Sequence, residues 1–419
     1  MAATSATDLA PARPAAPAGT TAVPGPRVRD PRLDFYRGIA MFIILFAHTP
    51  GNFFTSWIPA RWGFSDATEI FVFCSGMASA IAFGGSFDRS GWRLGTARVS
   101  FRCWQVYWAH IGMFFTIAML MAVLNEVSPV DKNYVGSLNL WKFFADPGPQ
   151  LIGLFTLTYV PNYFDILPMY LAILAMMPIV MILARIHLGA VFVFMGFVWL
   201  AAQGRILEPM GLMSLNFPAE PWSAREWFFN PFGWQLIFFT GFAFMRGWLP
   251  RPPVKAWLIG LCALIVLANV PLSNIGVREL GFDWARDWRI ANQWLITKSD
   301  FGILRYVHFL ALGYLAWVAA GEGGRRLIAH GQTALSRVWG FIVAQITKVG
   351  QQSLAVFVFS MVFARLVGAT LDAVGRTGFT VTALNLLGCA MLITVAYGAG
   401  WYKGQPWRKR PTAAAQVAA

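Results

Sequence analysis

The sequence predicts an all-α, polytopic membrane protein, and three observations support this fold class. Of the 419 residues, 57% are hydrophobic and only 12% are charged, whereas charged residues make up about a quarter of a typical soluble domain. The apolar residues gather in runs of about 20, the length that crosses a bilayer as a helix. The net charge of +14 is too dispersed among these runs to form a phosphate-binding surface. We therefore expect the lipid bilayer, and no nucleic acid, as a partner.

The two ends of the chain differ in composition from the rest. Residues 1–28 are mostly Ala, Pro, Thr and Gly and lack the apolar core of a signal peptide, so a disordered cytoplasmic tail is expected. Residues 29–403 are expected to form one membrane domain, followed by a short cytoplasmic tail at 404–419. The four cysteines lie in or beside apolar runs without the spacing of metal ligands, which predicts neither a disulfide nor a metal site.

Ten apolar runs are long enough to be membrane-spanning helices. They cover residues 33–50, 66–85, 102–124, 165–184, 188–203, 230–248, 254–272, 301–320, 345–367 and 379–400. An eleventh run, at 151–160, is only ten residues long and is stopped by Pro161. If it does not span, most Lys and Arg residues fall on the side of the N-terminus, as the positive-inside rule requires. We therefore expect ten spans with both termini cytoplasmic, and an interfacial or re-entrant segment at 151–160.

The first predicted helix carries an unusual set of polar residues. Asp30 followed by Pro31 is typical of a helix start, and Asp34 and Arg37 are neighbours on one face. Arg37 and His48 are eleven residues apart, so they return to the same face with an axial separation of about 16 Å. Ionisable groups inside a bilayer usually face a cavity or a partner. Alternatively, Arg37 reaches lipid phosphates and His48 merely ends the helix at the headgroups.

The second predicted helix begins with two carboxylates, Asp66 and Glu69, at its expected outer end. A carboxylate at this depth could pair with His48, fix its tautomer and stabilise its protonated form. Alternatively, Asp66 caps the helix and Glu69 interacts favourably with its first turn. The sequence leaves both alternatives open.

Three further polar sites fall at predicted outer helix ends. Asp165 is either a helix cap or a second carboxylate that could orient His48. Arg305 and His308, three residues apart, could bind an anionic group or anchor the helix in the headgroups. Asn230 and Gln235 stand beside aromatic residues, which would suit a sugar but is also typical of the interfacial aromatic belt.

Several segments resemble a known family. Residues 33–40, LDFYRGIA, with ten residues between Arg37 and His48, resemble the first-helix signature of the acyltransferase 3 superfamily, and residues 69–76, EIFVFCSG, resemble its second-helix motif. The flanking segments are more similar to the OpgC family, whose named members succinylate osmoregulated periplasmic glucans. These segments are residues 29–34, 48–52, 167–170, 230–235 and 351–354. The likeness covers about residues 29 to 400. The basic segment 89–102 lacks the close Arg pair of many superfamily members.

The resemblance implies a multi-pass acyltransferase of the bacterial inner membrane. It would move a succinyl or acetyl group from cytoplasmic acyl-CoA to a hydroxyl of an extracytoplasmic glucan or other envelope saccharide, without a metal. Glucan-synthesising membrane proteins are possible partners.

Site residues follow from the same resemblance and from the polar pattern. His48 is expected to be the general base, oriented by Glu69 or Asp165. The donor is expected near the basic end of the first helix, where Arg89 and Arg102 add further positive charge. The acceptor is expected near the polar outer helix ends. The donor-site residues are Arg37, Asp34, Arg93 and Arg98; the acceptor-site residues are Asp66, Asn230, Gln235, Arg305 and His308.

A function of another class also fits the sequence. A transporter or flippase for an acyl group, lipid or saccharide could use Arg37, His48 and Glu69 to line its path. Transporters often contain internal repeats and broken helices; the sequence shows no clear inverted repeat, and 151–160 is its one re-entrant candidate.

Overall fold

The computed structural model describes residues 30–408, and the regular elements of this part are helical. An isolated antiparallel bridge between Pro218 and Glu226 is the only β-pairing within the described range. The predicted tail at 1–28, and residues 409–419 of the predicted C-terminal tail, lie outside the described residues.

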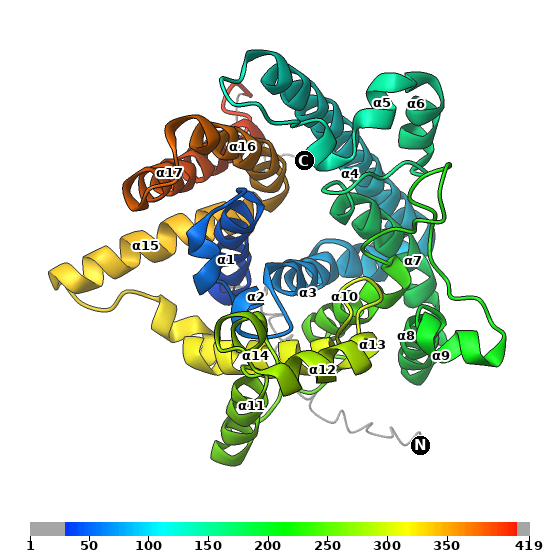
Figure 1. Cartoon of the computed structure of the whole chain (residues 1–419). Coiled ribbons are helices and arrows are strands. Elements are labelled where there is room, and N and C mark those ends of the chain that lie inside the picture. Colours follow the sequence, from blue (N-terminus) through cyan, green and yellow to red (C-terminus); the bar gives the residue numbers. More distant parts are fainter. Residues whose placement is uncertain (1–29, 409–419) are drawn as a thin grey trace, which may run out of the picture.

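The α-helices follow one another along the chain with mostly short connections (Figure 1). They are α1 (Pro31–His48), α2 (Pro59–Trp62), α3 (Ala67–Ser79), α4 (Gly85–Val127), α5 (Trp141–Ala145), α6 (Pro147–Thr156), α7 (Ile166–Ile186), α8 (Leu188–Ala201), α9 (Gly204–Leu207), α10 (Pro231–Arg246), α11 (Ala256–Ala268), α12 (Asp283–Ala291), α13 (Gln293–Ile296), α14 (Ile303–Ala320), α15 (Ala334–Gln351), α16 (Ser353–Val374) and α17 (Gly378–Lys403). Shorter 3₁₀ or π segments are Phe53–Trp57, Ala80–Gly84, Gly136–Leu138, Glu208–Met210, Ile275–Glu279 and Glu322–Leu327.

Each of the ten predicted spans contains a helix, but fewer helices meet the length and hydropathy expected of a span. Among the described residues, five do so by themselves, and a sixth is formed if Leu188–Ala201 and Gly204–Met210, bent by 79°, count as one span. The five are Ala67–Val127, Ile166–Ile186, Ile303–Ala320, Ser353–Val374 and Gly378–Lys403. The all-helical membrane fold is therefore supported, and the count of ten spans and the cytoplasmic termini stay predictions.

The short apolar run at 151–160 lies partly in a separate ten-residue helix, α6. The helix ends where Leu157 adopts a left-handed backbone with φ of 60°. At a rise of 1.5 Å per residue its length is about 15 Å, half of the hydrocarbon thickness. This helix is too short to cross a bilayer.

Helix α15 is not among the predicted helices, since the sequence indicated a connecting segment over most of its length. Thr333 caps it by accepting a hydrogen bond from the Ser336 amide. Its residues are apolar on one face and polar on the other, so it lacks the continuous apolar run that was used to find spans. Helix α15 packs against α1 and projects outward from it (Figure 1).

Glycines allow two helix pairs to approach at backbone distance. A Cβ atom on Gly38 would lie 2.0 Å from the Ile346 carbonyl oxygen, and one on Gly350 would lie 1.8 Å from the Asp34 carbonyl oxygen, so α1 and α15 contact through both glycines. The pair α3 and α10 is built in the same way, with Gly76 against the Phe238 carbonyl oxygen. Small residues at such positions are typical of helix packing in membranes. This packing fixes α1 near the centre of the molecule (Figure 1).

Candidate functional site

Helices α1 and α16 run side by side in the same direction. At one end, which we call the Arg37 end, the Arg37 guanidinium donates to the Ser353 hydroxyl. At the other, the His48 end, the His48 ring meets Tyr163, and Tyr163 is bonded to α16. Arg37 therefore contacts α16 directly and His48 contacts it through Tyr163, about 16 Å apart along the axis of α1. The shared face predicted for Arg37 and His48 is confirmed.

The hydrogen bond of His48 determines which ring nitrogen can act as a base. Nδ1 lies 2.8 Å from the carbonyl oxygen of Ile44, one turn earlier in α1. A carbonyl oxygen only accepts, so Nδ1 must donate its proton and, in the neutral ring, Nε2 keeps a free lone pair. The backbone of α1 thus does the orienting that the sequence assigned to a carboxylate.

Tyr163 and Arg365 complete the His48 end, and neither was predicted. The rings of His48 and Tyr163 meet edge to face, with centroids 5.3 Å apart. The Tyr163 hydroxyl donates to the Met361 carbonyl oxygen at 2.7 Å, and the guanidinium carbon of Arg365 lies 3.8 Å from the Tyr163 ring centre. Tyr163 has φ of 90°, an uncommon conformation for a bulky residue that is held only where the surroundings fix it.

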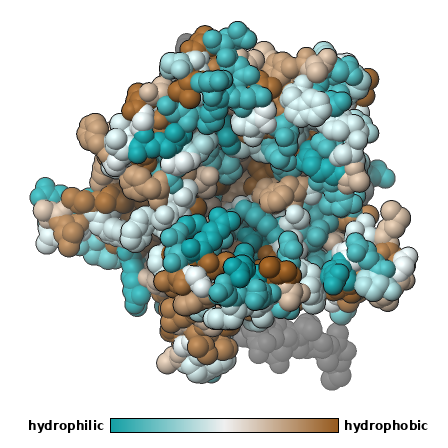
Figure 2. All heavy atoms as spheres, viewed as in Figure 1, coloured by the Kyte–Doolittle hydropathy of each residue, from teal (hydrophilic) through white to brown (hydrophobic). Residues whose placement is uncertain are grey.

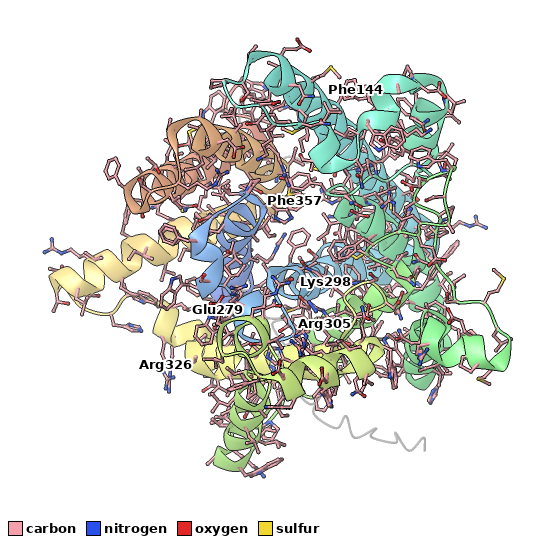
Figure 3. All side chains as sticks on the ribbon, viewed as in Figure 1. Phe144, Glu279, Lys298, Arg305, Arg326 and Phe357 are labelled. Carbon is pink, nitrogen blue, oxygen red and sulfur yellow. The ribbon has the colours of Figure 1, made fainter. Side chains whose placement is uncertain are left out.

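Glu69 does not orient His48, because both of its oxygens are used elsewhere. One accepts from the Arg305 Nε at 2.6 Å, and the other accepts from the Asp66 amide at 2.7 Å. Asp66 caps α3 through the Thr68 amide and forms an ion pair with Lys298. Figure 3 shows Lys298 and Arg305 close together. The capping alternative for Asp66 and Glu69 is therefore the one observed.

This ion-pair network also corrects the expected role of Arg305. Glu69 is fully buried and Arg305 nearly so, and a buried carboxylate needs such a partner. Two carboxylates meet two cations, so the cluster is neutral overall and Arg305 holds α14 against α3. Its Nε donates to Glu69 and its Nη2 lies 3.8 Å from an Asp66 oxygen, so the guanidinium already faces two carboxylates of the protein.

The other predicted acceptor residues also serve the fold. Asp165 accepts a hydrogen bond from the Phe228 amide at 3.3 Å, not from His48. Asn230 is fully buried, caps α10 through the Phe232 amide, and donates to the Leu215 carbonyl oxygen.

The other hydrogen bonds of the Asn230 and Gln235 side chains are also made within the protein. Asn230 also donates to the Asp300 carboxyl at 3.1 Å. Burial raises the pKa of this Asp300 carboxyl. Gln235 is fully buried and donates to the Met195 carbonyl oxygen at 2.8 Å. Asn230 and Gln235 are therefore not exposed to a sugar.

His308 is buried beside the loop that precedes α3. Its Nδ1 lies 2.7 Å from the Ser65 hydroxyl oxygen, and a Cβ on Gly63 would come within 2.4 Å of its ring. The glycine is thus required for the ring to fit. This packing fixes the position of the His308 ring, whose Nε2 is buried without a hydrogen-bond partner among the described residues.

A cavity of about 230 Å³ lies between α1, α3, α4, α7 and α16. Its basic residues are Arg37 and Arg102, and its lining on the α3 side runs from Phe71 to the π segment that follows α3. The complete lining is Arg37, Phe71, Ser75, Ala78, Ser79, Ala82, Phe83, Arg102, Leu167, Tyr170, Ser353 and Leu354. These helices surround the centre of Figure 1. Figure 2 shows the face of the molecule at the His48 end, where hydrophilic residues surround a hollow.

The cavity changes which arginines belong to the basic end. Arg93 and Arg98 are exposed and do not line it, and Arg98 donates to the Ser86 hydroxyl at 2.8 Å. Arg102, which was also expected at this basic end, lines the cavity with Arg37, and the charges of both act on Lys403 at the end of α17. Arg37 thus lines the cavity, whereas Arg93 and Arg98 lie away from it. Asp34 is buried next to Arg37, with an oxygen 3.9 Å from its Nη1.

Within residues 30–408, no group of three or more His, Cys, Asp or Glu side chains is arranged to hold a metal ion.

Comparison with known proteins gives one match. The family model described as OpgC protein matches residues 29–404, which is nearly the whole described chain. No curated protein and no solved structure matches the chain.

Proposed function

The chain belongs to the OpgC protein family, and from this premise we propose that it is a membrane O-acyltransferase acting on glucans. Family membership suggests a glucan-modifying transferase, and the several apolar helices suggest a membrane protein. The finer proposal is that the donor is a cytoplasmic acyl-CoA, with a succinyl or acetyl group, and that the acceptor hydroxyl lies on the opposite side of a bacterial inner membrane.

The proposed donor site is the cavity at the Arg37 end. Coenzyme A carries several phosphate charges, and arginine binds phosphate through paired hydrogen bonds. Arg37 and Arg102 provide this chemistry at the cavity, with the Lys403 charge nearby. At about 230 Å³ the cavity is smaller than pockets for drug-sized ligands, which measure about 300–1,000 Å³. It would therefore take the pantetheine arm while the nucleotide stays outside.

The proposed acyl transfer takes place at the His48 end. His48 Nε2 accepts the proton of the glucan hydroxyl while the hydroxyl oxygen attacks the thioester carbonyl carbon. The C–S bond then breaks, and the coenzyme A thiolate leaves and takes up the proton from the imidazolium. The products are a glucan ester and free coenzyme A. The observation that carries this proposal is the Nδ1 bond to Ile44, which leaves Nε2 as the basic nitrogen.

An aromatic pair separates the two ends. Phe71 lines the cavity and stacks on Phe357, with ring centroids 5.7 Å apart. Phe357 lies on α16 between Ser353 and Met361, and Figure 3 shows it near the centre of the molecule. In the proposal, the acyl end of the donor must displace this pair to reach His48.

The test is turnover in detergent, where no sealed compartment exists. Purified protein is mixed with succinyl-CoA or acetyl-CoA, with and without glucan, and released thiol is measured. An enzyme of the proposed kind releases thiol in a glucan-dependent manner. Absence of release from either donor, together with movement of an acyl group or saccharide across reconstituted vesicles, would instead support the transporter or flippase alternative.

A further inference from the structure

Arg365 is a cation in an apolar helix that the proposed reaction has not yet used. Its guanidinium lies over the Tyr163 ring, and its Nε is buried without a hydrogen-bond partner. Among the described carboxylates, none forms an ion pair with it. An ionisable residue inside a membrane helix is costly and usually marks a functional site.

Other cations at the His48 end form ion pairs with carboxylates of the protein. Lys298 pairs with Asp66, and Arg305 pairs with Glu69. Asp372, on α16 itself, accepts from Lys132 and Arg376. These charges are already balanced within the protein, so a negatively charged ligand group would find its partner at Arg365.

A small cavity adjoins Arg365. It measures about 100 Å³ and is lined by Pro50, Met121, Lys132, Tyr134, Ser137, Arg365, Gly368, Ala369 and Asp372. It is less than half the size of the cavity at the Arg37 end. Its size therefore suits the end of an acyl chain.

The cavity also lies close to the proposed reaction centre. Tyr163 contacts both the His48 ring and the Arg365 guanidinium, which places the guanidinium carbon no more than about 9 Å from the His48 ring centre. Through space, the Arg365 charge acts on the His48 imidazole. An acyl group whose carbonyl is attacked beside His48 could extend a few bonds and reach Arg365.

We propose that Arg365 binds a carboxylate at the far end of the acyl chain and thereby selects a dicarboxylic acyl group over acetyl. This inference rests on the acyl transfer proposed above. It moves the recognition of the acyl carboxylate from Arg305, which is held by Glu69, to Arg365 beside Tyr163. The rigid planar fork of arginine suits a carboxylate, and Tyr163 keeps that fork in place.

Donor selectivity tests this inference. The ratio of kcat/KM for succinyl-CoA to that for acetyl-CoA is measured in the wild type, Arg365→Met and Arg365→Lys. Arg376→Met is the matched control, because Arg376 lies at the same end but pairs with Asp372. We expect the ratio to fall about tenfold or more in Arg365→Met through loss of succinyl transfer, to fall less in Arg365→Lys, and to stay unchanged in Arg376→Met.

A second readout does not depend on the stability of the variant. Free succinate is expected to inhibit acetyl transfer by the wild type, whereas butyrate, which lacks the second carboxylate, is not. Equal inhibition by both, or equal loss of both donors in Arg365→Met, would overturn the inference. A loss that appears only with a phosphate-bearing glucan would assign Arg365 to the acceptor and overturn it as well. If the wild type turns over neither donor, the proposed acyl transfer itself fails.

Discussion

The two ends of α1 use charge in opposite ways. At the Arg37 end, the cations Arg37 and Arg102 face a cavity, with Lys403 near them. At the His48 end, Asp66 and Glu69 are matched by Lys298 and Arg305 in contacts within the protein. The difference teaches that polar residues in one membrane protein need not share a role: the cations at the Arg37 end line a cavity, whereas the charges at the His48 end pair with one another and hold helices together.

The largest expected effect is at the base itself. His48→Gln keeps a hydrogen-bonding side chain but removes the basic nitrogen, so acyl transfer should fall by about 10²- to 10⁴-fold, the usual contribution of a general base. The measurement is the rate of thiol release with glucan present. His330→Gln, at an exposed histidine, is the control and should keep the wild-type rate. Equal rates in the two variants would contradict the role of His48.

Disrupting the ion-pair network around Glu69 should mainly lower the stability of the protein, and not act directly on acyl transfer. Glu69→Gln leaves Arg305 buried without its carboxylate, and breaking a buried pair in this way costs about 3–5 kcal/mol. We expect a clear drop in the melting temperature in detergent. Glu226→Gln provides a control, since Glu226 is on an exposed loop and accepts from Asn216. A Glu69→Gln protein that melts like the wild type but loses turnover would instead make Glu69 part of the catalytic machinery.

The donor end should show a smaller effect, confined to binding. Arg37→Gln and Arg102→Gln should each raise the KM for acyl-CoA about tenfold, as expected for the loss of a charge-assisted hydrogen bond. Arg93→Gln and Arg98→Gln should change it little, because those side chains lie away from the cavity. Initial rates over a range of donor concentrations distinguish the two pairs. The reverse ranking would place the nucleotide on the exposed face of α4.

The smallest expected effect concerns Asn230. Asn230→Ala removes the cap of α10 and the bonds to Leu215 and Asp300, which should lower stability by about 0.5–2 kcal/mol, the usual loss for a cap. The KM for glucan should not change, since Asn230 is fully buried. Thermal unfolding and glucan titration measure the two effects separately. A raised glucan KM at unchanged stability would restore the predicted role in acceptor binding.

Helix periodicity made part of this arrangement predictable. The ten apolar runs each contain a helix, and the eleven-residue interval between Arg37 and His48 gave their shared face. Helix α15 was missed because its apolar residues are interrupted by polar ones at helical spacing. Such a helix gains its stability from packing on α1, which a hydropathy scan does not register.

The residues around His48 were harder to predict for other reasons. Glu69 and Arg305 are 236 positions apart, so their pairing depends on how α3 and α14 pack. The positive φ of Tyr163 has no sequence signal, since glycine or asparagine would be expected there. Arg365 did carry one, as a cation deep in the apolar run 345–367, whose other cation, Lys348, lies near the start of the run.

The most direct test of the central claim is the mass of the glucan made by cells. Cells without this protein are complemented with the wild type or with His48→Gln, and their envelope glucans are compared by mass spectrometry. The account predicts a mass increment of a single acyl type in the wild type, which identifies the acyl group, and its absence in the variant at equal protein level. An undiminished increment with His48→Gln would contradict acyl transfer at the His48 end.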